Sequence, residues 1–502
     1  MKWIRKVLIL THRYLGICLG LLFFVWFASG IGMVFAGGMP RLDPATRLER
    51  MPALDLGRIN VTPSEAATKA GLRRSPGRIL LFTLMDRPAY RFGAGGSSTV
   101  FADDGDTLPD VDERASLAIA ARFANVPLSA LHHVAVLDAP DQWTIDQRRQ
   151  MPLHKIAVDD GAGTVLYVSG DTAEVVMRTT RRTRALAWVA AIPHWLYFVP
   201  LRLNAQLWTR VVVWTSLLGT ASVAIGLVLA ATQYRVKYNG WMKWHYWTGV
   251  VFGVFALTWV VSGYLSMETI QWFSDSSGGG ARIPLSLSGG ALDVSAFPTI
   301  DAAAWQRALG ERAGRVKEIE YRRVQGDAYF VLNGLGARSV LLSAATLEPR
   351  RAPFALDSIM ERMQDGYNAP IADSQVLDHY DAYYYDRDRE APLPVIRVQF
   401  GDADQTWVYV DGNSQMVARF TRRQRIERWV YHGLHSLDFS FWYYSRWWDV
   451  GVIALLLGGT SLSAIGVVIG LRRLRRSVTR RRTTKKGDAE ASPLSASNPA
   501  ES

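Results

Sequence analysis

The sequence predicts an α-helical membrane protein in which four transmembrane helices form two repeats of two and carry two large α+β regions outside the membrane. Three observations support this fold class: long apolar segments, basic clusters beside them, and an internal duplication. The chain has 502 residues, of which 49% are hydrophobic, and it contains 18 tryptophans. This apolar content exceeds that of an ordinary soluble domain, and a membrane location accounts for the excess.

Four stretches are long and apolar enough to cross a hydrocarbon layer, which takes about 20 residues. They are 15–35, 211–231, 247–267 and 450–470. With their flanks they predict transmembrane helices at 1–36, 206–232, 245–268 and 447–471. The remaining segments are large regions at 37–205 and 269–446, a short loop at 233–244, and a basic, disordered tail at 472–502.

The net charge of +12 is concentrated beside these apolar stretches. Residues 471–487 carry nine lysines and arginines and no acid, and further basic residues occupy 2–6 and 235–243. Basic residues flanking membrane helices mark the cytoplasmic side, so both termini are expected in the cytoplasm and the two large regions are exported. The basic tail is therefore interpreted as a membrane anchor and not as a nucleic-acid site.

An internal duplication relates the two halves of the chain. The aligned pairs include His12 with His245, Trp26 with Trp259, His194 with His435, and Gly219 with Gly459. Each half reads as a helix, an exported region of two small α+β units, and a second helix. Because each half crosses the membrane an even number of times, the pseudo-twofold axis runs along the membrane normal and equivalent residues lie at equal depth.

The first pair of histidines stands on a flat helix face. Three glycines follow each histidine at positions that return to the same side of a helix with 3.6 residues per turn. They are Gly16, Gly20 and Gly30 after His12, and Gly249, Gly253 and Gly263 after His245. A neutral imidazole is the usual axial ligand of haem iron, and a face without side chains leaves room for a porphyrin plane. Close helix packing on small residues is the alternative explanation.

The second pair, His194 and His435, precedes the second and fourth apolar stretches on the exported side. Equal depth predicts that His12 pairs with His245 and His194 with His435. A pairing of opposite ends would have to bridge a bundle about 30 Å thick. His432 is a runner-up ligand for the exported pair, although its equivalent position holds no histidine.

These motifs resemble those of the PepSY-associated transmembrane proteins of bacterial inner membranes. The segment from His12 through Gly16 to Ser29 and Gly30 resembles the first-helix motif of that family, and His435-Ser-Leu before a glycine-rich helix resembles the second. The resemblance covers almost the whole chain apart from the tail. It implies a multi-pass inner-membrane protein with cytoplasmic termini and periplasmic PepSY-like regions at 37–205 and 269–446.

Members of this family include ferric-siderophore reductases that carry b-type haems between two such halves. The resemblance therefore implies two haems b, with His12, His194, His245 and His435 as axial ligands of the iron. It also implies reduction of a ferric siderophore or other ferric chelate in the periplasm, with release of Fe(II). Aromatic residues near His435 are the predicted substrate contacts. They are Tyr383, Tyr384, Tyr385, Trp442 and Tyr443.

The electron donor must be a separate cytoplasmic or membrane component. No Gly-x-Gly-x-x-Gly motif follows a predicted strand, and the cytoplasmic segments are too short for a flavin or nicotinamide domain. Two alternatives remain open: a PepSY-type regulatory or binding protein without redox activity, and a transporter of a siderophore or metal. The predicted spans contain no acidic residue in their middle, which counts against transport. The sequence leaves the chelate, the donor and the oligomeric state open.

Overall fold

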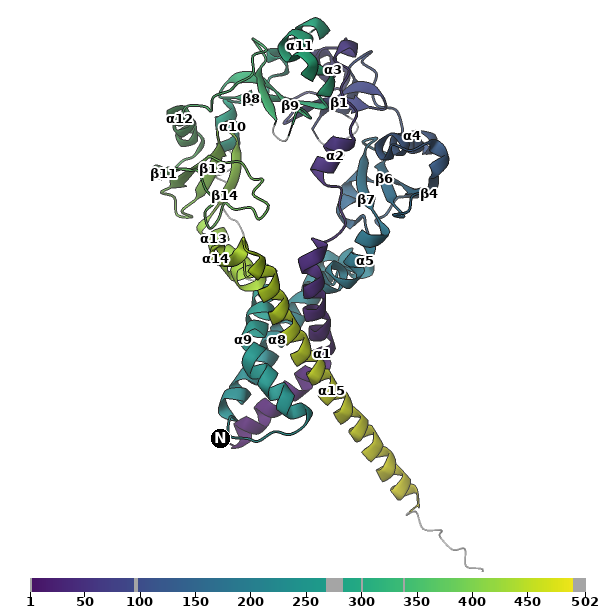
Figure 1. The fold of residues 1–502 in the computed structure, drawn as a ribbon, viewed down its shortest axis with the longest axis vertical. Helices are drawn as coiled ribbons and strands as arrows, with labels where there is room; N and C mark the ends of the chain where they lie inside the picture. The colour runs from purple at the N-terminus through teal and green to yellow at the C-terminus, as the bar shows by residue number, and fades with distance from the viewer. Residues whose placement is uncertain (1, 94–97, 268–282, 299–300, 337–338, 491–502) are drawn as a thin grey trace, which may run out of the picture.

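The computed structural model describes residues 2–93, 98–267, 283–298, 301–336 and 339–490, with the backbone alone for 478 and 480–490. Four long helices cross in a bundle at one end of the molecule, and strands and short helices form an arch at the other (Figure 1). We call the end of the bundle that holds residues 2–6 and 233–240 the basic end. The end that adjoins the arch is the domain end.

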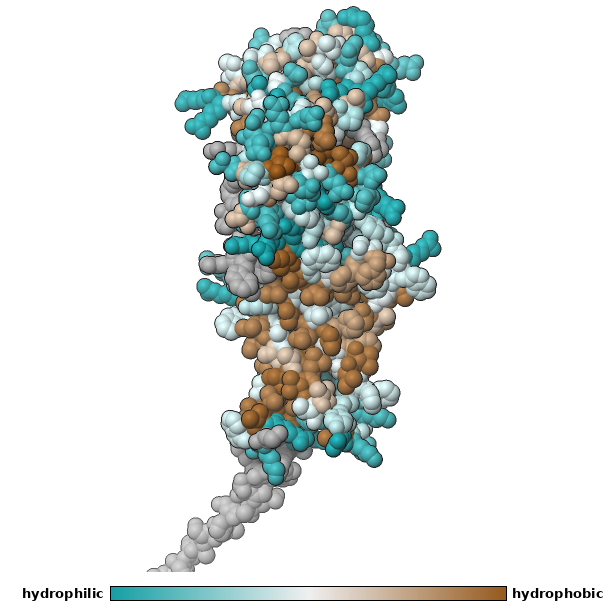
Figure 2. Space-filling view, turned by 90° about the vertical axis from the view of Figure 1, so that its left-hand side faces the viewer, coloured by the Kyte–Doolittle hydropathy of each residue, from teal (hydrophilic) through white to brown (hydrophobic). Residues whose placement is uncertain are grey.

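The bundle contains α1 (Lys2–Ala36), α8 (Ala205–Thr232), α9 (Trp241–Leu265) and α15 (Arg446–Glu490). Within the described chain these four helices are long and apolar enough to cross a membrane, with the candidate span of α15 ending at Ser477. Helices α1 and α9 each pack against both α8 and α15. On the face of the bundle that Figure 2 shows, apolar side chains predominate in a band, with hydrophilic residues above and below it.

The basic tail differs from its prediction. The sequence predicts a disordered segment at 472–502, whereas α15 continues as helix to Glu490, and residues 491–502 lie outside the described part. Arginine, lysine and leucine are good helix formers, and this stretch has no proline and no glycine before Gly487. The helix therefore extends beyond the apolar span.

The arch repeats one order of elements in each half. The first half contains α2 (Pro44–Arg50), α3 (Pro63–Lys69), β1 (Ile79–Leu84), β2 (Arg87–Phe92), β3 (Thr99–Phe101), α4 (Glu113–Ala124), β4 (Leu131–Leu137), β5 (Leu153–Val158), β6 (Val165–Ser169), β7 (Val175–Thr179), α5 (Arg181–Val189), α6 (Ala191–Trp195) and α7 (Val199–Arg202). The second half contains α10 (Ile283–Ser288), α11 (Ala302–Leu309), β8 (Glu318–Val324), β9 (Asp327–Asn333), β10 (Val340–Ser343), α12 (Leu356–Gly366), β11 (Ile371–Leu377), β12 (Val395–Phe400), β13 (Trp407–Asp411), β14 (Met416–Phe420), α13 (Arg422–Arg428), the π-helix η8 (Trp429–Ser436) and α14 (Ser440–Tyr443). Both halves are α+β, as the sequence predicts.

The strands form one six-stranded sheet, in the order β10-β9-β8-β1-β2-β3, and two four-stranded sheets, β4 to β7 and β11 to β14. The sequence predicts two separate units in each half, but the first units of the two halves share the six-stranded sheet. Strand β1 pairs antiparallel with β8, and Ile79 faces Tyr321 while Leu81 faces Ile319. The pairing covers an edge that each half alone would leave open, and one buried core continues across the junction.

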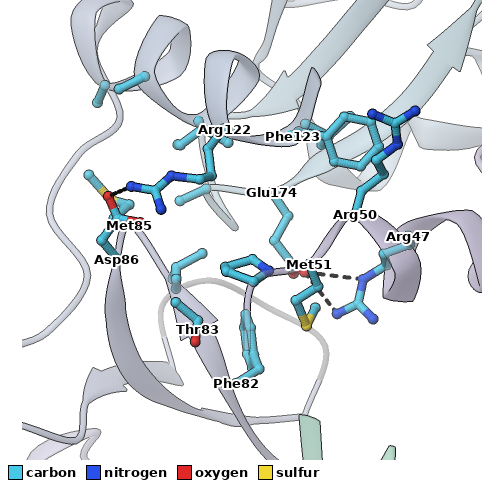
Figure 3. A pocket seen from close by; sticks show the side chains of 17 residues that line it. Arg47, Arg50, Met51, Phe82, Thr83, Met85, Asp86, Arg122, Phe123 and Glu174 are labelled. Carbon is cyan, nitrogen blue, oxygen red and sulfur yellow. Dashed lines mark hydrogen bonds and ion pairs between the residues drawn. The ribbon is translucent and has the colours of Figure 1, made fainter. Parts of the chain in front are cut away.

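The short helices α2 and α10 occupy the same place in the element order but pack differently. Helix α10 buries Ile283 and Leu287 against α12 and the second-half sheets. Helix α2 has no buried residue, and a cavity of about 220 Å³ lies between it, the β1–β2 turn and α4 (Figure 3). Arg47 reaches across this cavity to Glu174, with a nitrogen–oxygen distance of 2.9 Å.

Candidate functional site

The first pair of histidines lies in the bundle near the basic end. His12 on α1 and His245 on α9 face one another, with ring centres 6.2 Å apart and planes inclined by 39°. His12 Nδ1 lies 2.9 Å from the carbonyl oxygen of Ser222 on α8. A carbonyl only accepts hydrogen bonds, so Nδ1 carries the proton and Nε2 keeps its lone pair. His245 Nδ1 is buried and has no hydrogen-bond partner within the described part of the chain.

A cavity of about 540 Å³ opens between these two rings and the four helices. Four of the six predicted glycines line it, namely Gly16, Gly20, Gly249 and Gly253. This volume lies within the usual range for small-molecule and cofactor sites, roughly 300–1,000 Å³. The flat faces predicted from the sequence therefore border an open space.

Glycines also stand directly behind the two rings. A Cβ atom at Gly226 of α8 would lie 2.8 Å from His12 Cε1, and one at Gly466 of α15 would lie 3.6 Å from His245 Cε1. The first distance is too short for a real Cβ contact, so the position of the His12 ring depends on the bare backbone at Gly226.

The second pair lies at the domain end of the bundle. His194 on α6 and His435 on η8 have ring centres 6.1 Å apart and planes inclined by 68°. Each histidine is followed two residues later by a leucine with left-handed backbone, Leu196 at φ 51° and Leu437 at φ 54°, which ends the helical turn. The remaining predicted glycines, Gly30 and Gly263, lie beside this pair: a Cβ atom at either would be 3.6 Å or 3.9 Å from the nearest ring carbon.

Serines of α1 and α9 fix the tautomer of the second pair. Ser29 Oγ lies 3.2 Å from His194 Nδ1 and donates its own proton to the Trp26 carbonyl. Ser262 Oγ lies 3.0 Å from His435 Nδ1 and donates to the Trp259 carbonyl. Because both hydroxyl protons are engaged, each serine oxygen accepts from an Nδ1–H. The Nε2 lone pairs of both histidines remain available.

These contacts are what a metal-binding imidazole requires, because such a ring usually donates its other N–H to a carbonyl or an oxygen nearby. Two imidazoles that bind one iron from opposite sides, with bonds of about 2.0 Å, place their ring centres roughly 6 Å apart. The separations of 6.2 and 6.1 Å match this value. The residues therefore fit a haem iron at each end of the bundle.

The structure distinguishes between the two candidate histidines on η8. His435 faces His194, whereas His432 is exposed and its ring contacts Tyr431 at 5.1 Å. The position equivalent to His432 in the first half is Ala191, which is fully buried. Only His435 therefore has a partner across the pseudo-twofold axis.

The five aromatic residues predicted as substrate contacts do not form one open platform. Tyr384 is 6% exposed and stacks on Tyr409 in a core. The Tyr383 hydroxyl accepts a hydrogen bond of 3.2 Å from the indole of Trp429. Both side chains thus serve the packing of the second-half sheet and its following helix.

The other three aromatic residues gather directly behind the His435 turn. Trp442 Nε1 donates to the Leu437 carbonyl at 2.7 Å, and the rings of Tyr385 and Tyr443 are 5.9 Å apart. The Tyr385 hydroxyl donates to Asp438, and burial together with this carboxylate raises the pKa of Tyr385. These residues place polar and aromatic groups close to His435.

Sequence reasoning missed the charged partners of this cluster. Asp438 and Arg428 are 3% and 6% exposed and form an ion pair of 3.0 Å, while Arg428 also donates to the Asp438 and Ala382 carbonyls. The first half has Ala187 and Tyr197 at the equivalent positions. The repeat alignment gives no indication of this ion pair, because the pair occurs in only one half. The sequence alone does show that Arg428 stands one residue before the tryptophan shared by both halves.

No protein-family model matches this chain, and none of the curated proteins does. Among the described residues, no group of three or more histidine, cysteine, aspartate or glutamate side chains is arranged to hold a bare metal ion.

Proposed function

We propose that this protein is a haem-bearing electron carrier of the bacterial inner membrane, of the PepSY-associated transmembrane kind, that reduces a ferric chelate on the domain side. The observation that supports the proposal best is the presence of two facing histidine pairs, one at each end of a membrane-sized bundle. Haem bound between each pair supplies a one-electron couple.

The chain's own residues prepare both sites. The Ser222 carbonyl and the hydroxyls of Ser29 and Ser262 hold Nδ1–H bonds, which orient the rings and leave Nε2 as the basic nitrogen. A hydrocarbon core about 30 Å thick is too wide for a single electron transfer. Sites at both ends divide that distance into shorter steps, and Phe23, Phe27 and Trp259 fill the bundle between them.

The reaction on the domain side is Fe(III) in a chelate plus one electron to give Fe(II). The electron enters at the basic end from a separate donor, because the described chain has no domain for flavin or nicotinamide. Hard oxygen ligands hold the less charged Fe(II) more weakly, and the iron is released. The cluster of Tyr385, Trp442 and Tyr443 beside His435 is the proposed place of contact with the chelate. Both termini are then cytoplasmic.

The proposal is tested by optical spectra of the purified protein, first oxidised and then reduced with dithionite. We expect a Soret band, a sharpened α band of b-type haem after reduction, and two haems per chain. His245→Ala removes one of the two haems, since it breaks one pair and leaves the other. His379→Ala is the matched control, because that histidine lies on the surface with a 73% exposed side chain.

Three outcomes would each contradict a part of the proposal. A wild-type protein without a Soret band rules out the haem mechanism. Haem content that stays at two per chain in both His12→Ala and His245→Ala rules out the pairing. If both haems bind but a ferric chelate does not reoxidise the reduced protein, electron transfer to the proposed substrate is excluded.

A further inference from the structure

The cavity beside His12 and His245 has a charged mouth that breaks the symmetry of the bundle. Arg13 of α1 and Arg473 of α15 both line the cavity. Their equivalents in the repeat are Tyr246 of α9 and Gln233 of α8, which line the same cavity. Two guanidinium groups thus belong to the α1–α15 side, and two neutral polar groups belong to the α8–α9 side.

The polar groups on the neutral side of the mouth form hydrogen bonds within the protein. Gln233 Oε1 accepts hydrogen bonds from Arg5 at 3.2 Å and from the Tyr238 hydroxyl at 3.0 Å. The Tyr246 hydroxyl donates to the Ala230 carbonyl at 3.3 Å. These groups need no further partner and offer little to a ligand.

The two arginines on the cationic side lack such hydrogen bonds. Within the part of the chain that the structure describes, neither Arg13 nor Arg473 has a hydrogen-bonding or acidic partner. Both guanidinium groups therefore border the cavity without a counter-ion from the described protein. Arginines at helix ends also extend toward lipid headgroups. The neighbouring Arg472 is of that kind, because its guanidinium lies 5.3 Å from the Trp241 ring on the bundle exterior.

We propose that Arg13 and Arg473 bind the carboxylates of a flat dicarboxylate ligand in this cavity, namely the two propionates of haem. This inference rests on the proposed function and adds to it the orientation of the cofactor. Guanidinium groups bind carboxylates through paired, charge-assisted hydrogen bonds. Their place on the α1–α15 side directs the acidic edge of the ligand toward that side and toward the basic end, with the apolar edge among the glycines.

The experiment compares haem with its dimethyl ester, in which both carboxylates are blocked. Haem-depleted protein with His194→Ala, which retains only the basic-end pair, is titrated with each compound and binding is followed by the Soret band. The variants are Arg13→Gln with Arg473→Gln, and the matched control is Arg235→Gln with Arg472→Gln. The control removes two basic-end arginines that do not line the cavity.

The expected result is a loss of haem affinity of about tenfold for each cavity arginine, since one charge-assisted bond contributes about 1.4 kcal/mol or more. The ester is expected to bind the protein with both arginines as weakly as haem binds the Gln variant. The affinity for the ester is expected to be the same with and without the two arginines. The control pair binds haem as the parent does. Arg13→Lys with Arg473→Lys restores part of the affinity because the charge remains. The midpoint potential falls in the Gln variant, since two cations no longer stabilise the extra electron.

Two results would overturn this inference while the proposed function stands: equal haem affinity in the Gln variant and the parent, or equal binding of haem and ester to the parent. An unfolded Gln variant is recognised by its lost circular dichroism, and the ester titration of the parent then decides alone. A parent protein that binds no haem overturns both the inference and the proposed function.

Discussion

The two halves of the chain share their order of elements and the placement of their paired histidines. Each half presents one histidine near the basic end and one at the domain end, with a serine oxygen on Nδ1 of the latter. Each also has a partly buried aspartate that pairs with a cation and accepts a hydrogen bond from a tyrosine hydroxyl. These clusters are Asp141 with Lys155 and Tyr167, and Asp381 with Arg397 and Tyr409. Burial and the neighbouring carboxylate raise the pKa of both tyrosines.

The halves differ in the turn that carries the domain-end histidine. The second half has a π-helix there, an exposed His432, and the buried pair of Arg428 and Asp438. The first half has a short α-helix with buried Ala191. π-Helical turns are frequent at functional sites. The duplicated histidines thus form the two facing pairs, whereas the buried pair of Arg428 and Asp438, which has no duplicate, lies beside His435, as expected if the proposed substrate is received at that end.

The largest effect is expected from breaking the buried ion pair that only the second half has. Asp438→Ala leaves Arg428 buried without its counter-ion, which costs about 3–5 kcal/mol and lowers the thermal unfolding midpoint of the purified protein. Asp449→Ala is the control, because its pair with Arg387 is 40% and 37% exposed and such surface pairs contribute at most about 1 kcal/mol. Similar midpoints for the two variants would show that the pair is not a structural difference between the halves.

A smaller effect is expected from the two short helices that follow α1 and α9. Leu287→Ala in α10 removes a side chain that is 1% exposed, and such core truncations cost about 2–5 kcal/mol. Leu48→Ala in α2 touches no core, since α2 buries no residue, and is expected to cost less than about 1 kcal/mol. Thermal unfolding followed by circular dichroism measures both. An equal decrease of the unfolding midpoint in the two variants would mean that α2 contributes as much to stability through its packing as α10 does.

Much of the fold was predictable because a long apolar segment can be recognised in the sequence without knowing which other segments it packs against. The structure has a long apolar helix at each of the four predicted spans, although α9 begins at Trp241 instead of 245 and α15 continues well beyond 471. The six-stranded sheet was not predictable in the same way. Strand β1 has apolar residues on both faces, which shows that it is buried but not that its partner is β8 from the other half.

The candidate site, like the fold, was predictable from the sequence only in part. Duplication together with equal depth predicts which histidines pair, and the structure places those rings together. The hydrogen-bond partner of His12 Nδ1 was not predictable, because the Ser222 carbonyl is a backbone group and any residue type could supply it. The arginines of the cavity mouth were not predictable for other reasons. Arg473 belongs to the basic cluster 471–487, whose charge was already explained by membrane orientation, and Arg13 stands alone beside His12, with no arginine at the equivalent position in the other half.

The smallest expected effect concerns the paired glycines behind the basic-end histidines. Gly226→Ala introduces a Cβ atom 2.8 Å from His12 Cε1, whereas the same change at Gly466 gives an ordinary contact of 3.6 Å with His245. Alanine stabilises a helix interior by up to about 1 kcal/mol relative to glycine, so neither variant is expected to unfold. The crowding at Gly226 must instead displace the His12 ring, at a cost of about 1–3 kcal/mol. Haem titration of the basic-end site is therefore expected to show roughly tenfold weaker binding for Gly226→Ala and little change for Gly466→Ala, because only the first substitution moves a ligand. Equal affinities for the two variants would mean that the His12 ring can yield without loss, and that the asymmetry between these two glycines has no consequence for the site.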